Sequence, residues 1–165
     1  MKELLLVPIL SLATYLLYVY IKYGMTISIS ETYRELKIKE KFLFTVTLWA
    51  VAIPIIIVSI ETVKDQSPVL FFIAGSLLML VSASPTFWSG KMELTAHLIG
   101  SYGSIGIGIV ACLDYFFNPI TIYISGAYIL LVVVQFFIKK LRLNNFIYWL
   151  EIGAIITVTW VLYVN

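Results

Sequence analysis

Six runs of apolar residues follow one another along this chain, separated by short polar or helix-breaking segments. They occupy residues 4–23, 42–60, 68–84, 89–114, 119–138 and 145–164. A helix needs about 20 mainly apolar residues to cross a bilayer, so six crossings use almost the whole length. The pattern therefore predicts an all-α fold, a polytopic membrane bundle of six transmembrane helices that forms a single domain over residues 1–165.

The segments between the runs carry helix-start signals. Pro68 and Pro119 stand where the first residue of a helix tolerates proline best. The only long polar connection, residues 26–41, contains Ser28 and Glu31 at the spacing of a capping box. This spacing predicts a short interfacial helix that begins in the connection and runs into the second span.

The fourth run carries a ladder of small side chains. Ala96, Gly100, Ser104, Gly108 and Cys112 recur at every fourth position, which places them on one face of a helix. Small residues let membrane helices approach closely. We therefore expect this face to be a helix-packing seam and residues 89–114 to form the central helix of the bundle.

Composition agrees with a membrane protein and narrows the chemistry. Hydrophobic residues make up 61% of the chain and charged residues 12%, and the mean hydropathy is +1.01, which lies far outside the range of soluble domains. The single histidine and the single cysteine, Cys112, exclude a disulfide within the chain and a His- or Cys-rich zinc site. We predict no metal and no cofactor.

Basic residues gather in alternate connections. The segments after the first, third and fifth runs hold nine of them: Lys22, Arg34, Lys37, Lys39, Lys41, Lys91, Lys139, Lys140 and Arg142. Only Lys2 and Lys64 belong to the other side. Because cytoplasmic loops are enriched in Lys and Arg, this split predicts a bacterial cytoplasmic (inner) membrane protein with both termini outside. Placed in this way, the basic residues indicate membrane anchoring and no nucleic-acid binding.

Two ionisable residues lie inside apolar runs. His97 is about six residues, or roughly 9 Å at 1.5 Å per residue, from the start of the fourth run, and Glu151 is similarly deep in the sixth. Ionisable groups in the hydrocarbon region are costly, so each is a candidate functional residue. We expect the two to meet in a polar cavity that faces the cytoplasm. The other residues expected there are Glu93, Ser82, Ser84 and Gln135, covered by Ser28, Ser30 and Tyr33.

Several functions fit such a cavity. The first interpretation is a protein without catalytic activity that binds a lipid or a partner helix; its partners are membrane lipids, with a second copy of the chain or another membrane protein as alternatives. The second is a small transporter or channel in which His97 and Glu151 relay protons or ions. The third is an intramembrane lipid hydrolase or transferase that uses His97, Glu151 or Glu93 as acid or base. A structural alternative is a buried hydrogen bond that fixes helix register.

Several short motifs together resemble a family of small, uncharacterised bacterial multi-pass membrane proteins, loosely similar in layout to the FRAG/DRAM type. The motifs are Ser28-Ile29-Ser30 with Tyr33, Lys39-Glu40 with Phe42, Ala83-Ser84-Pro85-Thr86, and His97. The likeness covers residues 1–115, and it departs from the family pattern in having Lys39 in place of an arginine and Arg34 in place of a histidine. The resemblance implies the fold and the membrane location, and it implies no particular activity.

Overall fold

The computed structural model describes residues 2–63, 68–86, 89–137 and 145–165, and these residues form helices and no strand. The predicted all-α class is therefore confirmed. In chain order the elements are the 3-10 helix η1 (Lys2–Leu5), α1 (Leu6–Tyr23), α2 (Thr32–Glu35), the 3-10 helix η2 (Ile38–Glu40), α3 (Lys41–Thr62), α4 (Val69–Ala83), α5 (Lys91–Tyr115), α6 (Pro119–Phe137) and α7 (Phe146–Val164).

Five helical stretches within the described residues are long and apolar enough to cross a membrane. They are Lys2–Tyr23, Ile38–Thr62, Lys91–Tyr115, Pro119–Phe137 and Phe146–Val164. The predicted third span differs, because α4 has only 15 residues. At 1.5 Å per residue it is about 22 Å long, shorter than a hydrocarbon core of about 30 Å. The chain thus has the fold of a multi-pass membrane protein with five helices of full spanning length.

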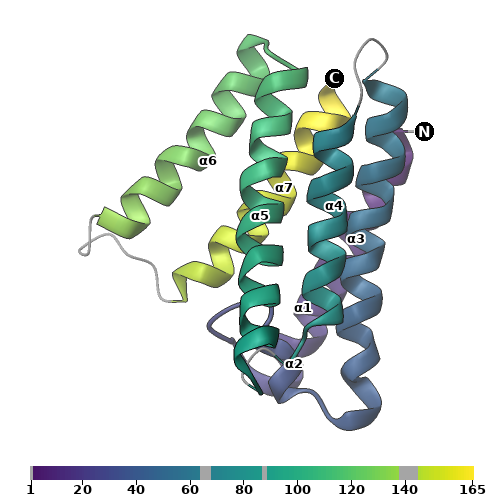
Figure 1. Cartoon of the computed structure of the whole chain (residues 1–165), viewed down its shortest axis with the longest axis vertical. Helices are drawn as coiled ribbons and strands as arrows, with labels where there is room; N and C mark the ends of the chain where they lie inside the picture. The colour runs from purple at the N-terminus through teal and green to yellow at the C-terminus, as the bar shows by residue number, and fades with distance from the viewer. Residues whose placement is uncertain (1, 64–67, 87–88, 138–144) are drawn as a thin grey trace.

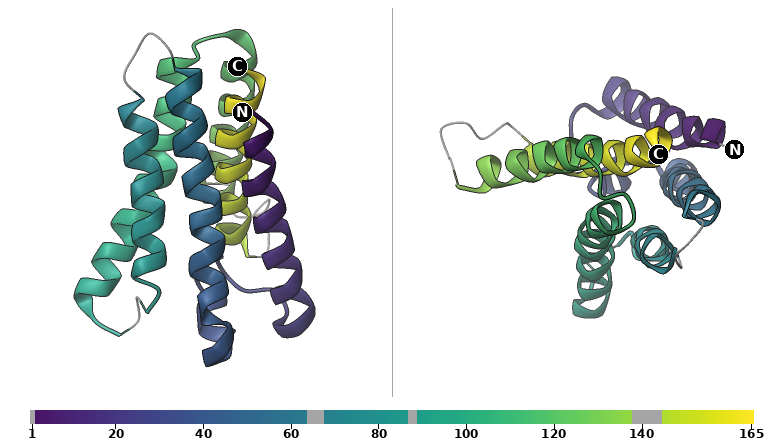
Figure 2. Two further views of the ribbon diagram at one scale, coloured as in Figure 1. Left: turned by 90° about the vertical axis from the view of Figure 1, so that its right-hand side faces the viewer. Right: turned by 90° about the horizontal axis from the view of Figure 1, so that it is seen from above.

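The long helices run alternately down and up the bundle (Figure 1). Helices α3, α4 and α5 stand side by side, with α4 in contact with both neighbours (Figure 2). Helix α7 packs against α1, α3, α5 and α6, whereas α5 packs against α4, α6 and α7. Helix α7 thus contacts more of the long helices than α5 does. The central position that was expected for residues 89–114 is therefore shared by α5 and α7.

Small residues of α5 meet α4 and α7. A Cβ added to Gly100 would lie 2.8 Å from Val81 Cγ2 and 2.9 Å from the Leu77 carbonyl oxygen, and one added to Gly108 would lie 3.2 Å from Val158 Cγ2. Ala96 and Ser104 of the predicted seam are half-buried. Gly100 thus marks a place where two helix backbones approach closely, which only a residue without a side chain permits.

The connection between α1 and α3 folds back into the bundle. Ser28 Oγ accepts the Glu31 amide at 3.1 Å, as a capping residue does, and α2 follows. The backbone is then extended at Leu36 and Lys37 before η2 leads into α3. The expected continuous helix into the second span is therefore wrong: the chain breaks at Leu36, whose side chain is buried in the core.

Candidate functional site

A cavity of about 490 Å³ lies between α5, α6 and α7. Helices α5 and α6 meet near their connection and diverge along their length (Figure 1), which leaves room between them. Most of the wall is apolar and includes Leu98, Ile105, Ile109, Ile129, Val132 and Val133. We call this space the larger cavity; its volume lies within the range of roughly 300–1,000 Å³ that is usual for small-molecule sites.

The acidic side chains, the histidine and the serines of the larger cavity come from three separate parts of the chain. The connection after α1 contributes Ser28 and Glu31, α5 contributes His97 and Ser101, and α7 contributes Glu151. His97 and Glu151 belong to the second turns of α5 and α7, and these helices begin toward the end of the bundle at which α2 lies (Figure 1). The larger cavity therefore has one polar end and long apolar walls.

Residues 26–32, which we call the cover segment, close this polar end. The side chains of Ile29, Ser30 and Thr32 are buried, with 4%, 5% and 0% of their surface exposed. Thr32 Oγ1 is 2.5 Å from the hydroxyl of Tyr15 on α1, and the Ile27 carbonyl accepts the Tyr148 amide of α7 at 3.0 Å. The cover segment is thus fixed to the first and last long helices.

Glu151 holds the cover segment from below. Its Oε2 accepts a hydrogen bond of 2.6 Å from the Ile29 amide, across 122 residues of sequence. A buried backbone amide is costly without a partner, so this carboxylate stabilises the folded-back chain. The same side chain lines the larger cavity and a second, smaller cavity of about 70 Å³ between α3, α4, α5 and α7. It therefore has a structural role and is also placed to contact a ligand.

His97 is buried, with 5% of its surface exposed, in the second turn of α5. Its Nδ1 lies 3.1 Å from the carbonyl oxygen of Ser84, and because a carbonyl only accepts, Nδ1 carries the proton. In a neutral ring Nε2 is then the acceptor. This bond also satisfies a carbonyl at the end of α4, a group that a helix leaves unpaired.

The structure places His97 and Glu151 on the wall of one cavity. The hydrogen bonds described above go to different backbone groups, the Ser84 carbonyl for His97 and the Ile29 amide for Glu151. The end of α4 thus contributes to holding His97, and the cover segment contributes to holding Glu151. A ligand in the larger cavity is exposed to both.

Other residues expected at the site serve helix packing or helix ends. Ser82 Oγ donates to the Met79 carbonyl at 2.6 Å and accepts from Trp49 Nε1 at 2.8 Å, which joins α4 to α3. The Glu93 carboxylate lies over Gly90, where an added Cβ would be 2.4 Å from its Oε2. An acidic group at this helix start is favoured by the helix dipole.

Tyr33 and Gln135 also lie elsewhere. The Tyr33 ring is 5.6 Å from that of Phe44 and 4.6 Å from the ammonium of Lys41, so it packs on α3. Gln135 is buried in α6 with 4% of its surface exposed. The described walls of the two cavities include neither residue, and they include none of Ser82, Ser84 and Glu93.

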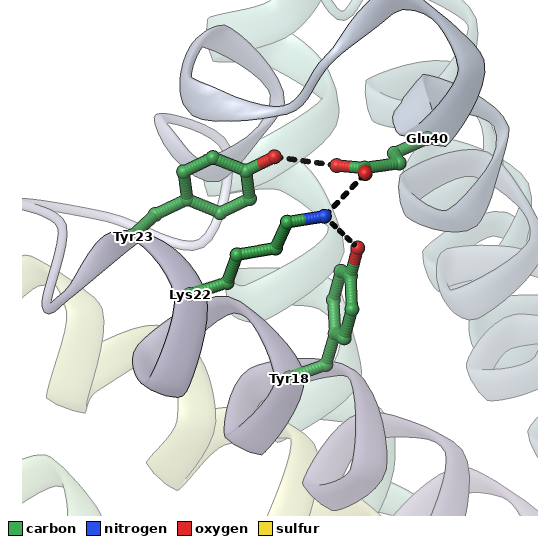
Figure 3. Close-up of polar contacts among 4 residues, drawn as sticks. All are labelled: Tyr18, Lys22, Tyr23 and Glu40. Atoms are coloured by element: carbon green, nitrogen blue, oxygen red, sulfur yellow. Dashed lines mark hydrogen bonds and ion pairs between the residues drawn. The ribbon is translucent and has the colours of Figure 1, made fainter.

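A polar cluster that was not predicted from the sequence joins the ends of α1 and η2. Lys22 Nζ donates to Glu40 Oε1 at 2.5 Å and to the Tyr18 hydroxyl at 2.9 Å, and Tyr23 donates to Glu40 Oε2 at 2.5 Å (Figure 3). We call these four residues the clamp. The spacing of Tyr18 and Lys22, four residues apart on a helix, was an available signal. The clamp brings together the two ends of the connection that contains the cover segment.

The chemistry available at the larger cavity is mainly hydrogen-bond acceptance. Within the described residues, no three His, Cys, Asp or Glu side chains are grouped so that they could hold a metal ion. The carboxylates of Glu31 and Glu151 and the hydroxyls of Ser28 and Ser101 line the polar end. This arrangement is suited to a polar group attached to an apolar chain.

Comparison with protein-family models, curated proteins and solved structures found no match to this chain. The resemblance to the FRAG/DRAM type of layout stays a prediction.

Proposed function

We propose that this protein is a six-span membrane protein that binds a lipid in the larger cavity. The observation that carries the proposal is the combination of long apolar walls with one polar end. An acyl chain is stabilised there by close contact with apolar side chains. A headgroup needs hydrogen-bond partners when it leaves the membrane surface, and the polar end supplies them.

The lipid enters from the bilayer, between α5 and α6. The residues that line this side are apolar and face outward: Leu98 is 40% exposed, Val133 45% and Phe136 56%. In a membrane, acyl chains cover such surfaces. An acyl chain that moves between α5 and α6 therefore exchanges one apolar environment for another, and the headgroup contacts decide whether it stays.

In this proposal α4 also crosses the membrane, despite its short length, and brings the number of spans to six. It lies between α3 and α5, which are long enough to reach both surfaces, and a short span is accommodated by local thinning of the bilayer at modest cost. Both termini are outside the cell, and the polar end of the larger cavity faces the cytoplasm. The location is the bacterial cytoplasmic membrane, as the basic residues of the connections indicate.

A cavity-filling variant tests lipid binding. Gly106 lines the larger cavity, and an added Cβ meets no atom within 4 Å there. Gly126 on α6 has equal room and is not part of the described cavity wall. Native mass spectrometry of protein released from mild detergent should show a bound lipid for the wild type and for Gly126→Leu, and loss of that lipid in Gly106→Leu. A lipid retained by Gly106→Leu would contradict the proposal.

Cysteine labelling tests the orientation. Cys112 is the single cysteine of the chain. A Cys112→Ala background therefore leaves no reactive thiol. Phe117 is 79% exposed at the α5–α6 connection, and Lys37 is exposed at the opposite end. In intact spheroplasts a membrane-impermeant maleimide should label Phe117→Cys and should not label Lys37→Cys until the membrane is opened. The reverse pattern would overturn the orientation.

A second candidate function is proton relay, because Glu151, Ser101 and Ile105 line both cavities. Glu151 is thus placed between the larger cavity and the smaller one deeper in the bundle. Proteoliposomes loaded with a pH-sensitive dye should then show proton flux that Glu151→Gln abolishes. No flux through the wild-type protein would remove this candidate and leave lipid binding intact.

A further inference from the structure

We propose that the larger cavity selects an amphiphile with a protonated amine as its headgroup and one long apolar chain. This inference rests on the proposed lipid binding and specifies its ligand. It follows from the charges at the polar end, from the hydrogen bonds that remain available there, and from the volume of the cavity.

The charges at the polar end favour a cation. Glu31 of the cover segment and Glu151 of α7 line the larger cavity, and its described wall contains no Lys or Arg. Arg34 contacts Glu31 Oε1 at 3.4 Å, but it lies on the outside, with 66% of its side chain exposed. An ammonium in the larger cavity is attracted by both carboxylates. A phosphate or carboxylate headgroup that carries no amine would be repelled, in an environment where water screens charges poorly.

The hydrogen bonds favour a donor with several protons. An ammonium has three N–H donors, and each carboxylate has about four acceptor positions. Glu151 uses one of these for the Ile29 amide, and Glu31 uses one for the long contact with Arg34. The polar end therefore has an excess of acceptors. A hydroxyl headgroup would supply one donor, and an anionic headgroup would supply acceptors only.

The volume favours a single chain. The volume of about 490 Å³ lies in the lower part of the range of roughly 300–1,000 Å³ that is usual for small-molecule sites. A space of this size suits one long chain. A lipid with two acyl chains can insert one of them. A free long-chain amine and an ethanolamine phospholipid each supply a protonated amine and one chain for the cavity, so they share the chemistry that the site recognises.

Binding of radiolabelled oleylamine to the full-length protein in a neutral detergent tests the headgroup, with oleyl alcohol and oleic acid as competitors of matched chain. Because hydrogen bonds to charged groups are worth more than neutral ones, we expect oleylamine to bind about tenfold more tightly than oleyl alcohol. Oleic acid should compete least. Competition by oleic acid that equals or exceeds that of oleyl alcohol would overturn the inference.

Variants assign the preference to the two carboxylates. Glu31→Gln and Glu151→Gln should each reduce the preference for the amine over the alcohol, and the double variant should abolish it. In Glu151→Gln the amide oxygen can still accept from Ile29, so the cover segment stays in place. Glu93→Gln is the matched control, since this carboxylate lies over Gly90 at the start of α5, and it should bind as the wild type does. An unchanged preference in the double variant would overturn the inference.

Two further measurements distinguish a membrane lipid from a free amine, and headgroup selection from lipid binding itself. In the same detergent, competition by phosphatidylethanolamine would identify the membrane lipid as the ligand, and competition by free amines alone would identify a single-chain amine. Competition by phosphatidylglycerol equal to either would overturn the inference. Binding of all three oleyl compounds with equal affinity would contradict the headgroup selection and leave lipid binding standing. Binding that Gly106→Leu does not reduce would contradict the proposed function itself.

Discussion

The two sides of α5 are packed in opposite ways, although glycines lie on both. At Gly100 an added Cβ would meet a side chain and a backbone carbonyl of α4, at 2.8 and 2.9 Å. At Gly106 it would meet nothing within 4 Å. The two positions are six residues apart, about one and two-thirds turns, so they lie on different faces. One glycine allows two helices to touch, and the other leaves a cavity open.

This difference extends to the helices on each side. The spanning stretch of α3 is 50% buried inside the bundle, and that of α6 is 22% buried. Gly75 of α4 repeats the close approach of Gly100, since its Cβ would lie 2.5 Å from Ile56 Cγ1. Helices α3, α4 and α5 thus form a rigid wall, and α6 is attached mainly through α7 and α5. A rigid wall facing a loosely attached helix is an arrangement that can admit a ligand without unfolding.

We call the side of α5 that packs against α4 the tight side, and the side that faces the larger cavity the open side. The largest expected effect is on the tight side. Gly100→Leu places four side-chain carbons against the Leu77 carbonyl and Val81, so α4 and α5 must separate. Because forcing extra carbons into a well-packed contact costs about 1–3 kcal/mol and more where backbone must move, we expect a fall of about 3 kcal/mol in the free energy of unfolding. Thermal unfolding in detergent, followed by tryptophan fluorescence, measures it.

The matched control is the same substitution on the other face of the same helix. Gly106→Leu has room for its side chain, so its Tm should stay within a few degrees of the wild type while lipid binding is lost. If Gly106→Leu lowers the Tm as much as Gly100→Leu does, the two faces are not packed differently and the comparison fails.

The next effect concerns the hydrogen bond between Glu151 and the cover segment on the open side. Glu151→Ala leaves the buried Ile29 amide without its partner, and an unsatisfied buried donor costs about 1–3 kcal/mol. Glu151→Gln keeps an acceptor and should lose less. Hydrogen exchange measured by mass spectrometry on peptides that contain Ile29 should become faster in the alanine variant. Equal exchange in both variants would show that the side chain of Glu151 does not hold the cover segment.

The helices could be predicted from the sequence because their signal is local. Each apolar run maps onto a described helix, and Pro119 begins α6 as expected. The length of α4 departs from the prediction because Pro68 precedes the helix as its N-cap and Ser84 is already non-helical. Spanning length is therefore a weaker inference than helix position, since a few residues at each end decide whether about 30 Å is reached.

The site could be predicted only in part because its contacts are distant in sequence. The depth of Glu151 was visible in the hydrophobic pattern, but its bond to Ile29, 122 residues away, was not. Glu31 matched a capping box, which gave no sign that it lines a cavity. The four-residue ladder singled out Gly100 as a packing position, and Gly106 lies off that ladder. That Gly106 faces a cavity depends on how α6 is placed, and this is a property of the whole bundle.

The smallest expected effect is at the clamp, which joins the ends of the connection on the open side. In Lys22→Met the apolar part of the side chain remains, and the contacts with Glu40 and Tyr18 are lost. Exposed ion pairs contribute little and are screened by salt. We therefore expect a slightly lower Tm than in the wild type at low ionic strength, and no difference at about 1 M salt, where charges interact over only about 3 Å. Lys39→Met, at an exposed position of η2, is the matched control.

Hydrogen exchange tests whether the clamp acts on the open side only. In that case Lys22→Met speeds hydrogen exchange at Ile29 and leaves exchange at Val81, on the tight side, unchanged. Faster exchange at both would mean that the two sides are coupled through α1 and α3, and that the cover segment cannot open while the rigid wall stays closed.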